Sequence, residues 1–160
     1  MGKKSIKENK NIYQTTRENL ELTREKASDL LNIISADRIE KIESGKSLPH
    51  PDEVLLMSEC YKVPSLCNYY CSHECPIGKV YVPEIKEKEL PQIVLEMLAT
   101  LNAINKDRER LIEITADGEI TSDEMKDFKA IQEKLEQISV ASESLQLWIK
   151  KAIFDGKVKD

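Results

Sequence analysis

Four cysteines within sixteen residues are the side chains of this chain best suited to chemistry. They are Cys60, Cys67, Cys71 and Cys75. Thiolates bind zinc and iron–sulfur clusters, so this set predicts a candidate metal site, with His73 as a substitute ligand. A continuous helix would place residues eight apart about 12 Å from each other, too far for one tetrahedral metal. The metal interpretation therefore requires the helix to break near Ser72.

Two other interpretations of the thiols remain open. Cys60 and Cys67 have the size and polarity of small core residues that pack one helix on the next, leaving Cys71 and Cys75 as partly exposed thiols. Alternatively, one thiol responds to oxidants, because thiolate reactivity depends on the surrounding charges. Zinc or an iron–sulfur cluster is thus a possible cofactor, and no other cofactor is expected.

Catalytic patterns are not found in the sequence. The chain has two histidines, His50 and His73, and lacks both a glycine-rich phosphate loop and a Ser-His-Asp arrangement. We therefore expect that the protein is not an enzyme.

Composition limits the class of protein. The chain has 160 residues, of which 40% are hydrophobic and 33% charged, enough to bury a core. Its apolar runs are only a few residues long, against the roughly 20 needed to span a bilayer. The start of the sequence is charged and lacks the apolar stretch of a secretory signal. We expect a cytoplasmic protein without membrane partners, whose thiols are reduced.

Charge is unevenly distributed along the chain. The net charge is −5, but residues 1–50 carry ten Lys or Arg and eight Asp or Glu, a net of +2, and the remainder a net of −7. A surface that faces nucleic acid is therefore expected in the first part of the chain, and one that faces protein in the acidic remainder.

Residues typical of helix starts and helix ends divide the first 75 residues into short helices. Thr23 and Ser35 are suited to cap helix starts, Pro51 to a first helical position, and Gly45 to a helix end with positive φ. The helices are expected over residues 12–21, 23–31, 35–44, 51–62 and 64–75.

Longer helices are expected in the second half of the chain. Proline and glycine mark a linker at 76–89, after which apolar residues recur at helical spacing over 90–115. A second long helix follows a turn, opened by Thr121 with Glu124 in capping-box spacing. Residues 90–160 are thus expected to form an antiparallel helical hairpin with coiled-coil character. Its unsatisfied apolar stripe favours pairing with a second copy, as a homodimer.

The order of signals between residues 10 and 70 resembles the Cro/Xre family of phage-repressor-like helix-turn-helix regulators. In that family an Arg-Glu pair precedes a Leu-Ser/Thr helix start, and the third helix ends in Ile-x-x-Ile-Glu-x-Gly-Lys. The matching residues here are Arg17, Glu18, Leu22 and Thr23, followed by Ile39, Ile42, Glu43, Gly45 and Lys46. The resemblance implies a five-helix DNA-binding domain over residues 1–75, in an all-α protein.

The resemblance also implies roles for individual residues. The expected core residues are Leu30, Ile34, Ile39 and Ile42, and Arg17 is expected to pair with Glu43. The expected DNA-binding residues are Thr23, Ala36, Asp37, Arg38, Lys41 and Lys46, with the third helix in the major groove. Two departures stand out: the chain from Ala27 to Gly45 is about two residues longer than usual, and Asp37 places a carboxylate near phosphates.

Two functions follow as hypotheses. The first is a sequence-specific transcriptional regulator that binds double-stranded DNA as a dimer through its C-terminal hairpin. The alternative is a protein-interaction adaptor that keeps a vestigial helix-turn-helix fold and senses metal or redox state through its cysteines.

Overall fold

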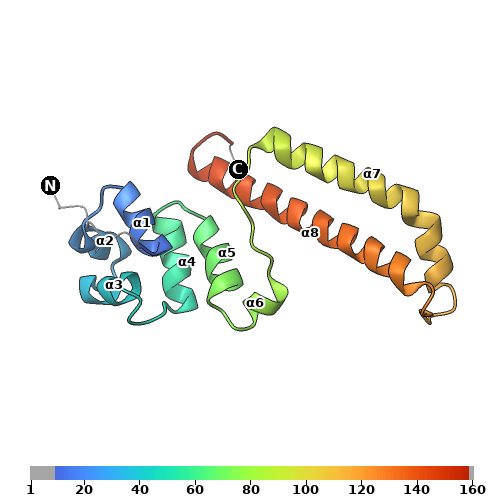
Figure 1. Cartoon of the computed structure of the whole chain (residues 1–160). Coiled ribbons are helices and arrows are strands. Elements are labelled where there is room, and N and C mark those ends of the chain that lie inside the picture. The colour runs from blue at the N-terminus through green and yellow to red at the C-terminus, as the bar shows by residue number, and fades with distance from the viewer. Residues whose placement is uncertain (1–9, 159–160) are drawn as a thin grey trace. The chain divides into compact units, whose positions relative to one another are not determined.

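The computed structural model describes residues 10–158, and every regular element in that range is a helix (Figure 1). This confirms the prediction of an all-α protein. The helices are α1 (Ile12–Asn19), α2 (Arg24–Leu31), α3 (Ala36–Glu43), α4 (Pro51–Cys60), α5 (Ser65–His73), α6 (Gly78–Tyr81), α7 (Leu90–Thr115) and α8 (Met125–Phe154). None of these described helices combines the length and apolar character needed to cross a membrane.

The chain divides into two compact units. Among the described residues, the first comprises residues 10–84 together with 153–158, and the second comprises Ile85–Ala152. The boundary at Glu84 lies inside the segment expected as a linker.

Side-chain caps start the short helices of the first unit. The Thr23 side chain accepts a hydrogen bond from the Lys26 amide, and the Ser35 side chain accepts one from the Arg38 amide, each at 3.2 Å. Both caps agree with the sequence prediction, as do Pro51 at the first position of α4 and the φ of +74° at Gly45. Local side-chain chemistry therefore sets the starts of α2, α3 and α4 before any packing.

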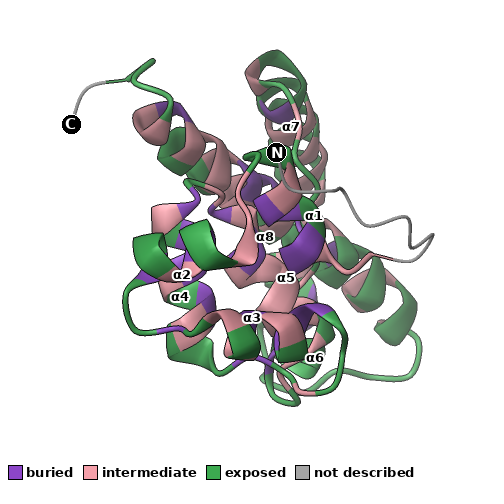
Figure 2. Ribbon diagram, turned by 90° about the vertical axis from the view of Figure 1, so that its left-hand side faces the viewer, coloured by how far each residue is buried: buried purple, intermediate pink, exposed green. Residues whose placement is uncertain are grey.

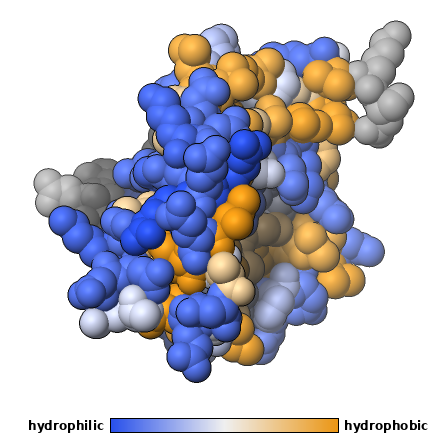
Figure 3. Space-filling model, turned by 90° about the vertical axis from the view of Figure 1, so that its right-hand side faces the viewer, coloured by the Kyte–Doolittle hydropathy of each residue, from blue (hydrophilic) through white to orange (hydrophobic). Residues whose placement is uncertain are grey.

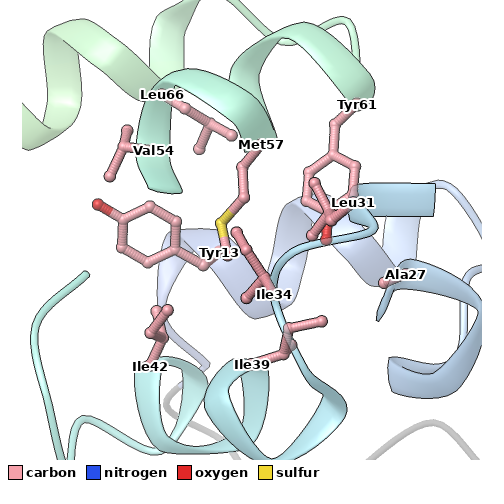
Figure 4. Packing of buried hydrophobic residues seen from close by; sticks show 10 residues of the cluster. All are labelled: Tyr13, Ala27, Leu31, Ile34, Ile39, Ile42, Val54, Met57, Tyr61 and Leu66. Atoms are coloured by element: carbon pink, nitrogen blue, oxygen red, sulfur yellow. The ribbon is translucent and has the colours of Figure 1, made fainter. Parts of the chain in front are cut away.

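The core of the first unit lies between α1, α2, α3, α4 and α5. In Figure 4, Met57 of α4 extends toward Tyr13 of α1 and toward Ile34, which precedes α3. The buried cluster consists of Tyr13, Ala27, Leu31, Ile34, Ile39, Ile42, Val54, Met57, Tyr61 and Leu66. Figure 2 shows exposed residues on the outward faces of α2 and α3, so each short helix contributes one apolar face to this core.

One predicted core residue was wrong. Leu30 is 47% exposed, whereas its neighbour Leu31 is 1% exposed and fills the core. Ala27 and Leu31 are both buried and four residues apart, which places them on one face of α2, and Leu30 lies about 100° around the helix from Leu31. Because the two leucines are adjacent, the sequence does not show which of them faces the core, and the packing of α2 decides it.

The connection from α2 to α3 contains a strained turn. Asn32 has φ 60° and ψ −46°, and the Ile33 amide donates to the Leu31 carbonyl at 2.6 Å. Those angles and that bond describe a γ-turn of the rare, classic kind. The turn leaves Ile33 75% exposed while Ile34 is buried, so it directs Ile34 into the core of the first unit.

A short helix, α6, occupies part of the expected linker. A Cβ added at Gly78 would lie 2.1 Å from the Cys71 carbonyl oxygen, so only glycine permits this close approach to α5. The Asn68 side chain also donates to the Pro83 carbonyl at 3.0 Å, which ties the segment after α6 to α5. Pro76 and Gly78 therefore mark a packed turn here rather than a free linker.

The second unit consists of α7 and α8 running side by side in opposite directions (Figure 1). Ile93 and Ile114 of α7, and Ile131 of α8, are at most 2% exposed. An ion pair between Asp107 and Lys134 joins the two helices along the same seam, with Lys134 three residues after Ile131 and Asp107 seven residues before Ile114. A second ion pair, between Arg110 of α7 and Asp127 of α8 at 2.8 Å, also joins the two helices, so apolar packing and charged pairs both hold them together.

The start of α8 differs from the predicted capping box. The helix begins at Met125, after turns over residues 121–124. The Glu124 carboxylate accepts from the Thr121 amide at 3.0 Å, as a capping box requires, but it also accepts from the Thr121 hydroxyl at 2.7 Å. That hydroxyl therefore donates to the carboxylate instead of accepting from the helix backbone, and regular helix starts later.

The face that α2 turns toward the core predicts that substitutions of Leu31 and Leu30 change the free energy of unfolding by different amounts. Leu31→Ala should lower the free energy of unfolding by about 2–5 kcal/mol, because it empties part of a packed core. Leu30→Ala should cost less than about 1 kcal/mol, because Leu30 is half exposed. Urea denaturation of both variants, followed by circular dichroism, checks this. Equal losses would contradict the packing described here.

Candidate nucleic-acid interface

A buried ion-pair network centred on Glu43 joins the first three helices. Arg17 of α1 donates from Nε to Glu43 Oε1 at 2.5 Å and from Nη2 to Glu43 Oε2 at 2.9 Å. Arg24 of α2 donates from Nε to Oε2 at 2.8 Å. The Glu43 side chain is only 1% exposed, so the last residue of α3 is held by two guanidinium groups.

The predicted pairing of Arg17 with Glu43 is therefore present, with more partners than expected. Arg17 also donates to the Leu22 carbonyl at 2.5 Å, which fixes the connection between α1 and α2. The hydrogen bond to Glu43 raises the pKa of Arg17, an effect that outweighs the opposing effect of burial. Because Arg17 and Arg24 both donate to Glu43, the network links α1 and α2 to the end of α3.

The expected DNA-binding residues come from the starts of α2 and α3 and from the end of α3. Thr23 is the N-cap of α2, and Ala36 is the first residue of α3 and half-buried. Lys46 follows Gly45 and is exposed, with Nζ 3.1 Å from a carboxylate oxygen of Glu40. These residues thus lie at helix ends, where backbone N–H groups and lysines can meet phosphates.

Arg38 has a structural role that the sequence interpretation did not assign. Its guanidinium donates to both carboxylate oxygens of Glu53, at 2.7 and 2.6 Å, to the Ser47 hydroxyl, and to the Leu48 carbonyl at 3.0 Å. The bond with Glu53 raises the pKa of Arg38 and lowers the pKa of Glu53. Arg38 therefore ties α3 to the start of α4, and base contact would require breaking these bonds.

Asp37 and Lys41 form a pair on the outer face of α3. Lys41 Nζ lies 2.7 Å from a carboxylate oxygen of Asp37, and the two side chains are 49% and 73% exposed. The hydrogen bond from Lys41 lowers the pKa of Asp37, so this carboxylate stays charged. The three cations of the candidate surface, Arg38, Lys41 and Lys46, are each matched by a carboxylate.

Three residues of the site were missed from sequence. Arg24 joins Glu43, and both Ser47 and Glu53 hold Arg38. The spacing of His50 and Glu53 around Pro51 gave one signal, since Glu53 also accepts from the His50 amide at 2.7 Å in the manner of a helix cap. Arg24 and Ser47 gave none, because their partners are distant in sequence.

The four cysteines do not assemble into a metal site. Helix α5 runs unbroken through Ser72 to His73, so the break required for a common metal does not occur there. Among residues 10–158, no group of three or more His, Cys, Asp or Glu side chains is arranged to bind a metal ion. Cys60 and Cys67 instead pack against the buried cluster of the first unit, in agreement with the core-packing interpretation.

Comparisons with protein-family models, with curated proteins and with solved structures find no match for this chain.

The network around Glu43 predicts unequal roles for its two arginines. Arg17→Ala should lower the free energy of unfolding by about 3–5 kcal/mol, because it removes a buried partner of a buried carboxylate. Arg24→Ala should cost much less, because the Arg24 side chain is 36% exposed and water can replace it. Thermal or urea unfolding of both variants measures the difference. An Arg17→Ala protein as stable as the unsubstituted chain would contradict this role.

Proposed function

We propose that the protein is a sequence-specific DNA-binding transcriptional regulator of the helix-turn-helix type, acting as a dimer. The observation that carries this proposal is the α2–α3 pair, which Glu43 and its two arginines hold rigid while the outer face of α3 stays exposed. In helix-turn-helix proteins the second helix of the motif, which corresponds to α3 here, enters the major groove with its N-terminal turn first. Thr23 and Ser35 cap the two helix starts that would meet phosphates.

The charged pairs on this face differ in how easily DNA can replace them. Exposed pairs such as Lys41–Asp37 and Lys46–Glu40 contribute only about 0–1 kcal/mol, so phosphates can compete for these lysines. Arg38 is held by four hydrogen bonds and stays in place. We therefore expect Lys41 and Lys46 to supply the exchangeable cations, with Arg38 positioning α3.

The second unit supports the dimer part of the proposal. Val94, Leu98 and Leu101 follow one another at spacings of four and three along α7, and they are 39%, 51% and 41% exposed. This is the spacing of a coiled-coil seam, on a helix whose other side already packs on α8. Apolar side chains also reach the surface in several patches of Figure 3. A second copy would cover the α7 stripe and bring two α3 helices to two half-sites.

A protein-interaction adaptor is the second candidate, favoured by one observation. The outer face of α3 is electrically balanced, since Arg38, Lys41 and Lys46 are matched by Glu53, Asp37 and Glu40. Leu30 and Ile33, at 47% and 75% exposed, lie at the end of α2 and in the turn that follows it. A neutral face beside exposed apolar side chains suits a protein partner better than it suits DNA.

DNA binding predicts opposite effects for neighbouring charges on α3. Asp37→Asn should tighten binding to a selected duplex a few-fold, because it removes a repelled carboxylate and frees Lys41. Lys41→Gln should weaken binding and reduce the slope of log affinity against log salt by about one. Selection from a random duplex pool, followed by fluorescence anisotropy at several salt concentrations, measures both effects.

Lys79→Gln is the matched control, since Lys79 is an exposed lysine of α6 in the same unit. It should leave affinity unchanged. Failure of the pool to yield any sequence-selective duplex at moderate salt would refute the regulator and leave the adaptor.

Dimerisation through α7 predicts a change of mass in solution. Leu98→Glu with Leu101→Glu should convert a dimer to a monomer, because each would place a carboxylate in the seam between copies. Ala99→Glu is the matched control, because Ala99 is exposed on the same helix and lies about 100° or more around α7 from Val94, Leu98 and Leu101. Light scattering coupled to size exclusion gives the masses. A monomeric unsubstituted chain at micromolar concentration would refute this role for α7.

A further inference from the structure

Cys71 and Cys75 lie where α5 ends and the chain turns back on itself. The Tyr70 carbonyl accepts from both the Glu74 and the Cys75 amides, each at 2.9 Å. A carbonyl shared in this way marks a helix end at which the backbone leaves the helical path. Cys75 is therefore outside the rigid part of α5, whereas Cys71 is inside it.

Gly78 brings the two cysteines to a common neighbour. Its amide donates to Cys75 Sγ at 3.4 Å, and its Cα is so close to Cys71 that an added Cβ would lie 2.1 Å from the Cys71 carbonyl oxygen. Burial raises the pKa of Cys71, and the neighbouring Cys75 and Cys67 thiols raise it further. Cys71 and Cys75 thus both adjoin Gly78, Cys75 through its sulfur and Cys71 through its carbonyl group.

The other cysteines are less able to pair. Cys67 and Cys71 are both inside α5, where side chains four residues apart have Cβ atoms about 5–6 Å from each other. A disulfide needs Cβ atoms about 3.5–4.5 Å apart, so this pair would have to distort the helix. Cys60 is on α4, with its thiol 3.9 Å from the Leu30 carbonyl oxygen. Cys75, by contrast, lies between the end of α5 and the start of α6, so its backbone is not inside either helix.

We propose that Cys71 and Cys75 are an oxidant-responsive dithiol, which a peroxide converts to an intramolecular disulfide at the junction of α5 and α6. One thiol loses its proton and attacks a peroxide oxygen as the thiolate, so that a sulfur–oxygen bond forms and the oxygen–oxygen bond breaks. The hydroxide that leaves takes up the thiol proton and becomes water. The second thiolate then attacks the sulfenic sulfur, forming the disulfide and releasing a second water. Two thiols are oxidised and one hydrogen peroxide is reduced, and a dithiol reductant reverses the change.

Hydrogen peroxide is the probe that tests this site on the full chain. After mild treatment, intact mass should fall by about 2 Da, the two hydrogens lost on disulfide formation. Non-reducing peptide mapping should place the bond between Cys71 and Cys75, and dithiothreitol should restore the mass. Cys71→Ser and Cys75→Ser should each abolish the loss, whereas Cys60→Ser should keep it as the matched control.

A different bond would overturn the proposal. Mapping to Cys67–Cys71, links between chains, or sulfinic acid formed without any disulfide would each exclude the dithiol. If a serine variant fails to fold, as judged by circular dichroism, the peptide map of the unsubstituted chain still decides. The measurement uses no DNA, so its failure leaves the regulator proposal intact, and loss of DNA binding leaves this site intact.

Discussion

The buried carboxylate of Glu43 is the constraint on which the rest of the first unit depends. A carboxylate that is 1% exposed is costly unless its oxygens accept hydrogen bonds, and here two arginines from two other helices supply them. Because Arg17 comes from α1, Arg24 from α2 and Glu43 from α3, one charged group sets the relative placement of three helices. The apolar core then packs within a frame that the charges have fixed.

The number and burial of its hydrogen-bond partners separate a charge that holds the fold from one that can bind another molecule. Arg38 has several protein acceptors and links α3 to α4, whereas Lys41 and Lys46 each face one exposed carboxylate. Surface pairs are weak because water competes with both partners, so these lysines keep their freedom to bind elsewhere. The backbone of α3 is therefore held in place, while Lys41 and Lys46 can exchange their carboxylate partners for groups on another molecule. Because these lysines are matched by carboxylates, the outer face of α3 carries little net charge, which supports the adaptor as the second candidate.

Charge also enters the second unit, where it affects register. Asp107 and Lys134 pair across the seam between α7 and α8, among positions occupied by Ile93, Ile114 and Ile131. A shift of one helix by a turn would separate the two charges, so the pair favours the observed register. The apolar residues of α7 are more than α8 can cover, which is the physical reason to look for a second copy.

Sequence by itself determined the features that depend on neighbouring residues. The all-helical class, the capped starts of α2 and α3, the positive φ of Gly45 and the bounds of α7 follow from side chains within one helical turn or from regular spacing. Tertiary structure decided what depends on distant partners: Leu31 rather than Leu30 in the core, Arg24 on Glu43, Arg38 on Glu53, and α6 docked through Gly78. In each case the partners are far apart in the sequence or on different helices, and only packing in three dimensions brings them together.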